Sequence, residues 1–151
     1  MAHSDAMPPG ADFALGVPQV QVPAQGVLAG RVGEEAVLLS RLDGGYHAVS
    51  GTCTHYGAPL ADGLVVNGEV RCPWHHACFS LRTGRARKAP ALSPLAVWKV
   101  EVQGDRVFVR EQQDVQPAPP QPRTPRERIV IVGGGAAGFA AAQRLRQLGH
   151  E

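Results

Sequence analysis

Short hydrophobic stretches recur along the first two thirds of the chain and are separated by turn-forming residues. They have the length of strands and partly alternate between apolar and polar positions, as strands with one buried face do. Asp-Gly-Gly at 43–45, Asn-Gly at 67–68 and Gly-Asp at 104–105 are typical of hairpin turns. The predicted strands span residues 17–22, 26–32, 36–42, 46–50, 64–71, 95–102 and 106–110. The pattern therefore predicts a mainly β, antiparallel domain.

The hydrophobic pattern also divides the chain into four segments. Residues 1–12 are polar with a Pro-Pro-Gly sequence, which predicts a flexible lead-in to the β domain at 13–111. Residues 112–127 contain five prolines among Gln and Arg, as in a semi-rigid extended linker. In residues 128–151 an aliphatic strand at 129–132 precedes a glycine-rich turn and a helix at 139–148 with Gly149 as its cap, which predicts one partial βα unit.

Composition narrows the function classes. The 151 residues carry 15 Lys and Arg against 13 Asp and Glu, a formal net charge of +2, without a Lys-rich run, which argues against a nucleic-acid partner. No apolar run is long enough to span a bilayer and no signal-peptide pattern is present, so no membrane association and a cytoplasmic location are expected. The 3 cysteines cannot all pair within one chain, which argues against the disulfide framework of a small secreted domain.

Two short motifs place cysteine and histidine side by side. Cys53 is followed by His55, and Cys72 is followed by His75, with 16 residues between His55 and Cys72. Each motif supplies one thiolate and one imidazole, which are ligands for a soft transition metal. A binuclear iron–sulfur centre and a mononuclear zinc site that stabilises a binding module both suit such a set.

The order C-x-H, about 16 residues, C-x-x-H resembles the Rieske iron–sulfur family over most of residues 14–110. The resemblance implies a small antiparallel β-sandwich with a two-loop cluster-binding subdomain. It also implies that Cys53 and Cys72 bind the buried iron of a [2Fe-2S] cluster, while His55 and His75 bind the more exposed iron. All ligand positions are then protein side chains, so the cluster is expected to carry single electrons and to catalyse no reaction itself.

Neighbours of these four residues bear on the reduction potential. By the same resemblance, Ala58 and Trp74 stand where high-potential members carry a disulfide, and Ala77 and Phe79 stand where they carry Ser and Tyr hydroxyl donors. Hydrogen bonds to cluster sulfurs raise the potential. A ferredoxin-type centre with a potential of roughly −150 mV is therefore predicted.

Four further features of the β domain accompany the motifs. His76 stands where related sequences have Gly, and we interpret it as a turn residue, with a proton-accepting role or misligation in place of His75 as alternatives. Cys78 is interpreted as a small buried thiol and His47 as a structural residue. The basic run at 81–88 is interpreted as a solvated hairpin, with steering of an acidic redox partner as the alternative.

Near the carboxyl terminus, Gly133, Gly135 and Gly138 form G-x-G-x-x-G between the predicted strand and helix. This arrangement binds a dinucleotide pyrophosphate at a helix N-terminus, and here it looks like the FAD-binding start of flavin reductases. The acidic ribose-binding residue would lie beyond Glu151, so we expect the chain to be the first part of a longer flavoprotein. We expect these 151 residues alone neither to bind FAD nor to be catalytic.

The order of Rieske domain, proline-rich linker and FAD domain resembles the apoptosis-inducing-factor-like FAD-dependent oxidoreductases. That resemblance implies electron flow between NAD(P)H, FAD and the [2Fe-2S] cluster. The expected redox partner is a flavin domain on the same polypeptide or a separate reductase. The alternatives are a free-standing Rieske ferredoxin of an oxygenase system and the zinc-stabilised binding module.

Overall fold

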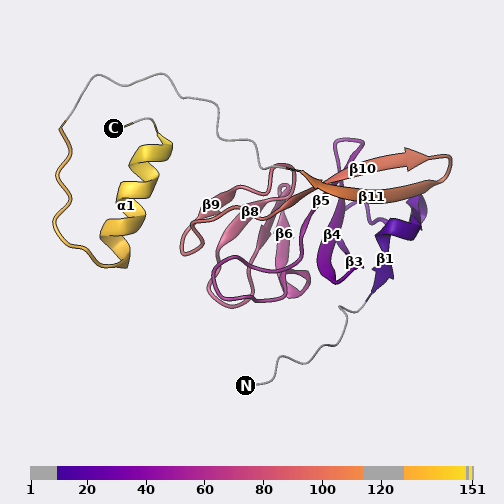
Figure 1. The fold of residues 1–151 in the computed structure, drawn as a ribbon, viewed down its shortest axis with the longest axis horizontal. Helices are drawn as coiled ribbons and strands as arrows, with labels where there is room; N and C mark the ends of the chain where they lie inside the picture. Colours follow the sequence, from indigo (N-terminus) through magenta and orange to yellow (C-terminus); the bar gives the residue numbers. More distant parts are fainter. Residues whose placement is uncertain (1–9, 114–127, 149, 151) are drawn as a thin grey trace. The chain divides into compact units, whose positions relative to one another are not determined.

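The computed structural model describes residues 10–113, 128–148 and 150. The chain divides into two units, Met1–Val115 and Gln116–Glu151, which are described separately below. The first unit consists of two β-sheets and three short 3-10 helices (Figure 1). The predicted fold class, a mainly β domain built from small antiparallel sheets, is confirmed.

The larger sheet has seven strands in the order β1-β3-β4-β5-β10-β11-β2. Strand β1 runs parallel to β3, and the other neighbours pair antiparallel. The strands are β1 (Ala11–Asp12), β2 (Val17–Pro18), β3 (Leu28–Val32), β4 (Glu35–Leu42), β5 (Gly45–Ser50), β10 (Val97–Gln103) and β11 (Arg106–Gln113).

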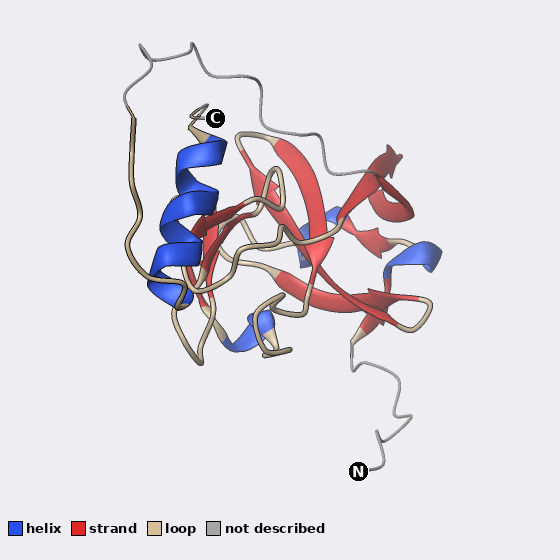
Figure 2. Ribbon diagram, turned by 60° about the vertical axis from the view of Figure 1, so that its left-hand side comes forward, coloured by secondary structure: helices blue, strands red, loops and turns tan. Residues whose placement is uncertain are grey.

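The smaller sheet lies between β5 and β10 in the sequence and carries the second Cys-His motif. Its four strands are antiparallel in the order β6-β7-β8-β9. Figure 2 shows the strands of the domain in red and the loops that join them in tan. The strands are β6 (Leu64–Val66), β7 (Glu69–Arg71), β8 (Cys78–Ser80) and β9 (Ala86–Lys88). The 3-10 helices are η1 (Phe13–Leu15), η2 (Gln19–Gln21) and η3 (Leu60–Asp62), the last of which leads from the first motif into β6.

Strand β4 separates two hydrophobic cores. Leu38 packs into the core shared with the small sheet, whereas Val37 and Leu39 pack into the core of the large sheet. A strand that is buried on both faces requires a continuous apolar run, which the sequence Val37-Leu38-Leu39 supplies. The two cores share this strand, so the small sheet is held directly against the large one.

Several predicted boundaries differ from those in the structure. The strand expected at 17–22 ends at Pro18 and continues as η2, because proline has no N–H to donate to a ladder. Residues 11–12, placed in the lead-in, pair with β3, and residues 112–113, placed in the linker, belong to β11. Strands β8 and β9 were not predicted; each has 3 residues and pairs with a neighbouring strand of the small sheet. The remainder of the predicted linker, 114–127, lies outside the described residues.

The second unit contains one helix. Helix α1 (Ala136–Gln147) begins three residues before the predicted start, and Gly149 lies outside the described residues. The strand predicted at 129–132 is wrong: these residues are exposed and unpaired. A strand needs a neighbouring strand to satisfy its backbone groups, and no described residue pairs with this segment. No helix among the described residues combines the length and apolar character needed to cross a membrane.

Candidate metal centre

The first Cys-His motif forms a loop closed by backbone hydrogen bonds to Cys53. The Cys53 N–H donates to the Ala58 carbonyl (2.9 Å), and the Gly57 N–H donates back to the Cys53 carbonyl (2.9 Å). The Thr54 hydroxyl donates to the Ser93 carbonyl (2.8 Å), which ties this loop to the proline-containing segment after β9. The loop therefore holds its cysteine at the base and presents its tip outward.

The second motif repeats the same backbone arrangement. The Cys72 N–H donates to the Ala77 carbonyl (2.8 Å), and the His76 N–H donates to the Cys72 carbonyl (3.2 Å). The fourth residue after each cysteine has a left-handed backbone, with φ of 76° at Gly57 and 62° at His76. The interpretation of His76 as a turn residue is confirmed, and the structure shows that it occupies the position that Gly57 has in the first loop.

This equivalence predicts that His76→Gly stabilises the domain. A side chain in the left-handed region costs about 1 kcal/mol, and glycine removes that cost. We expect the free energy of unfolding in urea to rise by about 1 kcal/mol. As the matched control, Gly57→Ala should lower it by a similar amount, because a Cβ at Gly57 meets no atom within 4 Å and only the backbone conformation is penalised. An unchanged or lower stability for His76→Gly would contradict the assignment.

The two motif cysteines are buried together in the core beneath the loops. Cys53 and Cys72 belong to one hydrophobic cluster with Leu60 and Phe79. Burial raises the pKa of the Cys53 thiol, the backbone N–H of His55 lowers it, and the adjacent Cys72 thiol raises it through a hydrogen bond and charge repulsion. The two sulfur atoms are therefore neighbours, which brings the predicted cysteine pair to one place.

The two motif histidines also meet, nearer to the surface. The ring centroids of His55 and His75 are 5.0 Å apart, with the rings nearly perpendicular. His55 is half-buried and His75 is exposed, whereas both cysteines are buried. The Nδ1 atom of His55 is buried without a hydrogen-bond partner among the described residues. A buried nitrogen of this kind costs free energy unless something binds it, so the site fits a group bound at that atom.

The four side chains form two pairs. No group of three or more His, Cys, Asp or Glu side chains within residues 10–113 and 128–148 is arranged to hold one metal ion. A thiol pair in the interior and an imidazole pair toward the surface suit the two ends of a binuclear cluster. The donor set and its geometry therefore fit [2Fe-2S] better than a mononuclear zinc ion.

Exposed aromatic side chains surround the imidazole pair. Tyr56 is 71% exposed and Trp74 54% exposed. The Tyr56 ring centroid lies 4.5 Å from that of His55 and 5.8 Å from that of His75. Tyr56 was assigned no role from the sequence. Only its position next to a motif histidine could have indicated that it lies at the site. These rings form an apolar rim where the site reaches solvent.

Positions that bear on the potential are occupied by apolar groups. Ala58, Ala77 and Phe79 are buried, and all three cysteines are free, so no disulfide joins the loops. The prediction that Cys78 is a buried thiol is confirmed. Its Sγ donates to the His76 carbonyl (3.5 Å).

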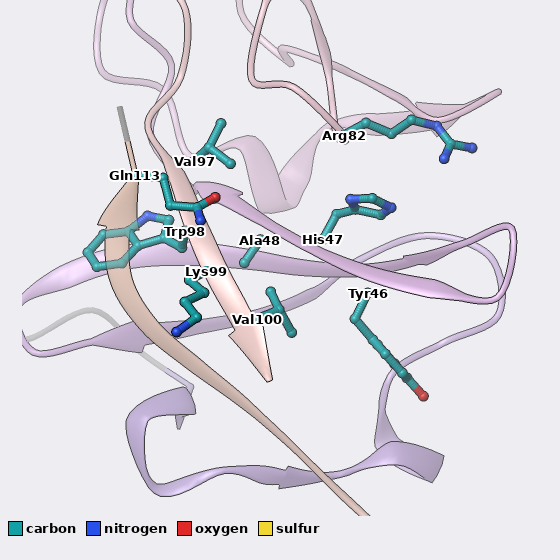
Figure 3. A pocket seen from close by; sticks show the side chains of 9 residues that line it. All are labelled: Tyr46, His47, Ala48, Arg82, Val97, Trp98, Lys99, Val100 and Gln113. Carbon is teal, nitrogen blue, oxygen red and sulfur yellow. The ribbon is translucent and has the colours of Figure 1, made fainter. Parts of the chain in front are cut away.

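A separate cavity of about 250 Å³ lies over β5 and β10 (Figure 3). No motif residue lines it. Of the cations that do, Arg82 is paired with Asp43, and Lys99 contacts Glu101 (3.0 Å) and Glu111 (3.4 Å). Burial lowers the pKa of His47, which favours the neutral imidazole. The cavity therefore offers no unpaired charged group, in keeping with the structural role predicted for His47.

The glycine motif in the second unit lies at the start of α1. Gly133 has φ of 112°, and a Cβ on Gly138 would overlap the Gly133 carbonyl oxygen. Gly135 is the N-cap of α1, and no side chain caps it. Glycine at 138 thus permits the close approach of helix and loop that dinucleotide-binding turns require.

Comparisons with known proteins give a family match and a longer relative. The family model of the Rieske [2Fe-2S] domain matches residues 15–99. The chain is 37% identical over 125 residues to human apoptosis-inducing factor 3, covering 75% of this chain and 21% of the relative. It thus spans about a fifth of that relative's length.

Two smaller proteins are similar to the β domain. The ferredoxin component of the naphthalene 1,2-dioxygenase system of Pseudomonas aeruginosa is 32% identical over 89 residues, covering 59% of this chain and 86% of the relative. Among solved structures, the ferredoxin of carbazole 1,9a-dioxygenase from Nocardioides aromaticivorans superposes with a TM-score of 0.59 at 25% identity, covering 69% of this chain and 97% of that one.

Proposed function

The chain belongs to the Rieske [2Fe-2S] domain family, and from this premise we propose that Cys53, Cys72, His55 and His75 hold a cluster that passes single electrons. One observation carries the assignment. The thiols meet in the interior and the imidazoles meet near the surface, with a buried and unpartnered Nδ1 on His55. A binuclear group needs two such donor pairs.

The surrounding residues perform the remaining tasks. When bound, the [2Fe-2S] cluster supplies a carrier for one electron. Buried Leu60, Phe79 and Leu81 exclude water from the thiol end. The exposed imidazole of His75 and the rim formed by Tyr56 and Trp74 are the part of the site that reaches solvent.

We propose that this partner is an FAD-dependent NAD(P)H reductase, on the same polypeptide or on a separate one. Similarity to apoptosis-inducing factor 3 and the Gly133, Gly135 and Gly138 motif at the start of α1 support the proposal. Isolated helix α1 with its loop lacks the sheet that a dinucleotide site needs, so this chain should not retain FAD. Isothermal titration with FAD is expected to give no heat of binding, and stoichiometric binding would contradict this step.

A second candidate function is that of a free-standing ferredoxin serving an oxygenase. The supporting observation is that the dioxygenase ferredoxin component is matched over 86% of its length. In that case the β domain alone would shuttle electrons between two separate proteins. Reduction kinetics with and without a covalently attached reductase domain distinguish the two arrangements.

Metal analysis of anaerobically purified protein tests the cluster itself. We expect two irons and two labile sulfides per chain, and a titration with dithionite that ends at one electron. Zinc should be absent because the thiols lie together in the core and the imidazoles lie together nearer to the surface. A colourless, redox-silent protein that contains zinc without iron would overturn the proposal in favour of a zinc-stabilised binding module.

A further inference from the structure

The small sheet has one face in the core and one face outside. Val70 and Phe79 are cross-strand partners and are fully buried in the core next to the motif cysteines. Side chains alternate between the faces of a strand, so the adjacent residues point away from the core. Leu64 pairs with Arg71, Arg71 pairs with Cys78, and Cys78 pairs with Lys88, next to an irregularity in the β8–β9 register. In this row Cys78 is buried, whereas Leu64, Arg71 and Lys88 are exposed.

This outer face combines exposed aliphatic side chains with cations that have no carboxylate partner. Leu64 is 60% exposed and Val66 is 50% exposed, both on edge strand β6. Within residues 10–113, neither Arg71 nor Lys88 forms an ion pair. We call the surface formed by Leu64, Val66, Arg71 and Lys88 the outer face.

The basic run at 81–88 contributes less net positive charge to the outer face than its composition indicates. Arg82 is bound to Asp43, and Arg87 is bound to Glu69 at 3.3 Å. Glu69 pairs with Val66 on this same face, and Arg87 offsets its charge, which leaves Arg71 and Lys88 as the net charges of the outer face. Arg71 was not part of the predicted run and reaches this surface through strand pairing.

Charge is distributed unevenly between the two sheets. Residues 51–95, which include both motifs and the small sheet, carry Arg71, Arg82, Arg85, Arg87 and Lys88 against Asp62 and Glu69. The residues of the large sheet, 10–50 and 96–113, carry seven Asp and Glu against five Lys and Arg. The net charge is therefore unevenly distributed over the domain, and its positive end includes the candidate metal centre. Such a distribution orients an oppositely charged protein before contact.

We propose that the outer face is the docking surface for a redox protein with an acidic surface. Arg71 directly precedes Cys72, so a protein on this face is brought beside the second cluster loop. The aliphatic side chains favour a protein over a polyanion, which would need a series of phosphate contacts instead of two cations beside Leu64 and Val66. The proposal rests on the proposed electron-transfer function.

Flavodoxin, an acidic FMN protein, serves as the probe. Its fully reduced flavin anion gives one electron to the oxidised centre, and no proton needs to move. Stopped-flow reduction at low ionic strength should be roughly tenfold slower for Arg71→Glu and for Lys88→Glu than for the unmodified chain. The difference should disappear at high salt, where charges are screened. Leu64→Ser should slow the reaction at every salt concentration, because it removes apolar contact.

Arg41→Glu is the matched control. Arg41 is an exposed cation of the large sheet, and its replacement changes the net charge by the same amount. Its rate should stay within twofold of the unmodified chain. Equal rates for Arg71→Glu, Lys88→Glu and Arg41→Glu would overturn the proposal.

Binding of oxidised flavodoxin, followed by thermophoresis, gives a second measurement that does not depend on electron transfer. The affinity should fall in the same order as the rates, and failure of the unmodified chain to bind would also overturn the docking surface. Iron content, determined on each sample, separates a failure of the proposed function from a failure of the docking surface. Absence of iron in the unmodified chain contradicts the proposed function, whereas intact iron with unaffected rates contradicts only the docking surface.

Discussion

Replacing Cys72 with alanine is expected to abolish the binding of iron and labile sulfide, whereas replacing Cys78 with alanine should leave both unchanged. Both cysteines are buried, and they lie only six positions apart in the sequence. Their surroundings differ. The Cys72 thiol neighbours that of Cys53, whereas the Cys78 Sγ donates to the His76 carbonyl. Thiolates are the ligands that hold an iron–sulfur cluster, and loss of one of two leaves an iron incompletely bound.

The measurement is colorimetric iron and sulfide analysis of anaerobically purified variants, together with the thermal midpoint. Because a bound metal group stabilises only the folded state, Cys72→Ala should also unfold at a lower temperature than Cys78→Ala. Cys53→Ala should behave as Cys72→Ala does. Full iron content in Cys72→Ala, or its loss in Cys78→Ala, would sink the assignment of Cys53 and Cys72 as ligands.

Adding hydroxyl groups beside the thiol pair should raise the reduction potential. Ala77 and Phe79 are buried, and Phe79 lies in the hydrophobic cluster that contains Cys53 and Cys72. A hydroxyl that donates a hydrogen bond to a sulfur favours the more negative, reduced state. A preference of about 1 kcal/mol corresponds to about 40 mV for a one-electron couple. Ala77→Ser and Phe79→Tyr should therefore each raise the potential by tens of mV, and the double variant by about twice as much.

Potentiometric titration measures the reduction potential of each variant. The comparison is the unmodified chain, for which a potential of roughly −150 mV is predicted. Cys78→Ser is the control. It adds a hydroxyl at the residue between Ala77 and Phe79, but the Cys78 side chain lies on the opposite face of β8 from Phe79. Its potential should match that of the unmodified chain. A potential that stays constant or falls in both hydroxyl variants would show that these positions do not reach the sulfur atoms.

Local chemistry explains why some predictions from the sequence succeed. Asn67-Gly68 joins β6 to β7, and both residues have positive φ, as the hairpin prediction requires. His76 adopts the turn conformation for which it was proposed. Such features depend on a few neighbouring residues, so they can be recognised without knowledge of the fold.

Predictions that depend on pairing between segments far apart in the sequence were less complete. Strands β8 and β9 are short, and β8 is held by β7 while β9 is held by β8. The expected strand at 129–132 pairs with no described residue and does not form. Backbone pairing requires a second segment, which hydrophobic pattern alone does not supply. The same reason explains why Arg71 was not associated with Lys88: they meet on the outer face only through strand pairing by way of Cys78.

The sequence by itself determined the donor types, their spacing and the turns that close the two loops. Only the tertiary structure decided that the thiols pair in the interior, that the imidazoles pair near the surface, and that Cys78 points elsewhere. Spacing along a chain specifies which groups are available, whereas burial and distance depend on how separate strands pack. The division into a buried thiol end and an exposed imidazole end, on which the proposed electron transfer depends, is therefore a property of the folded domain.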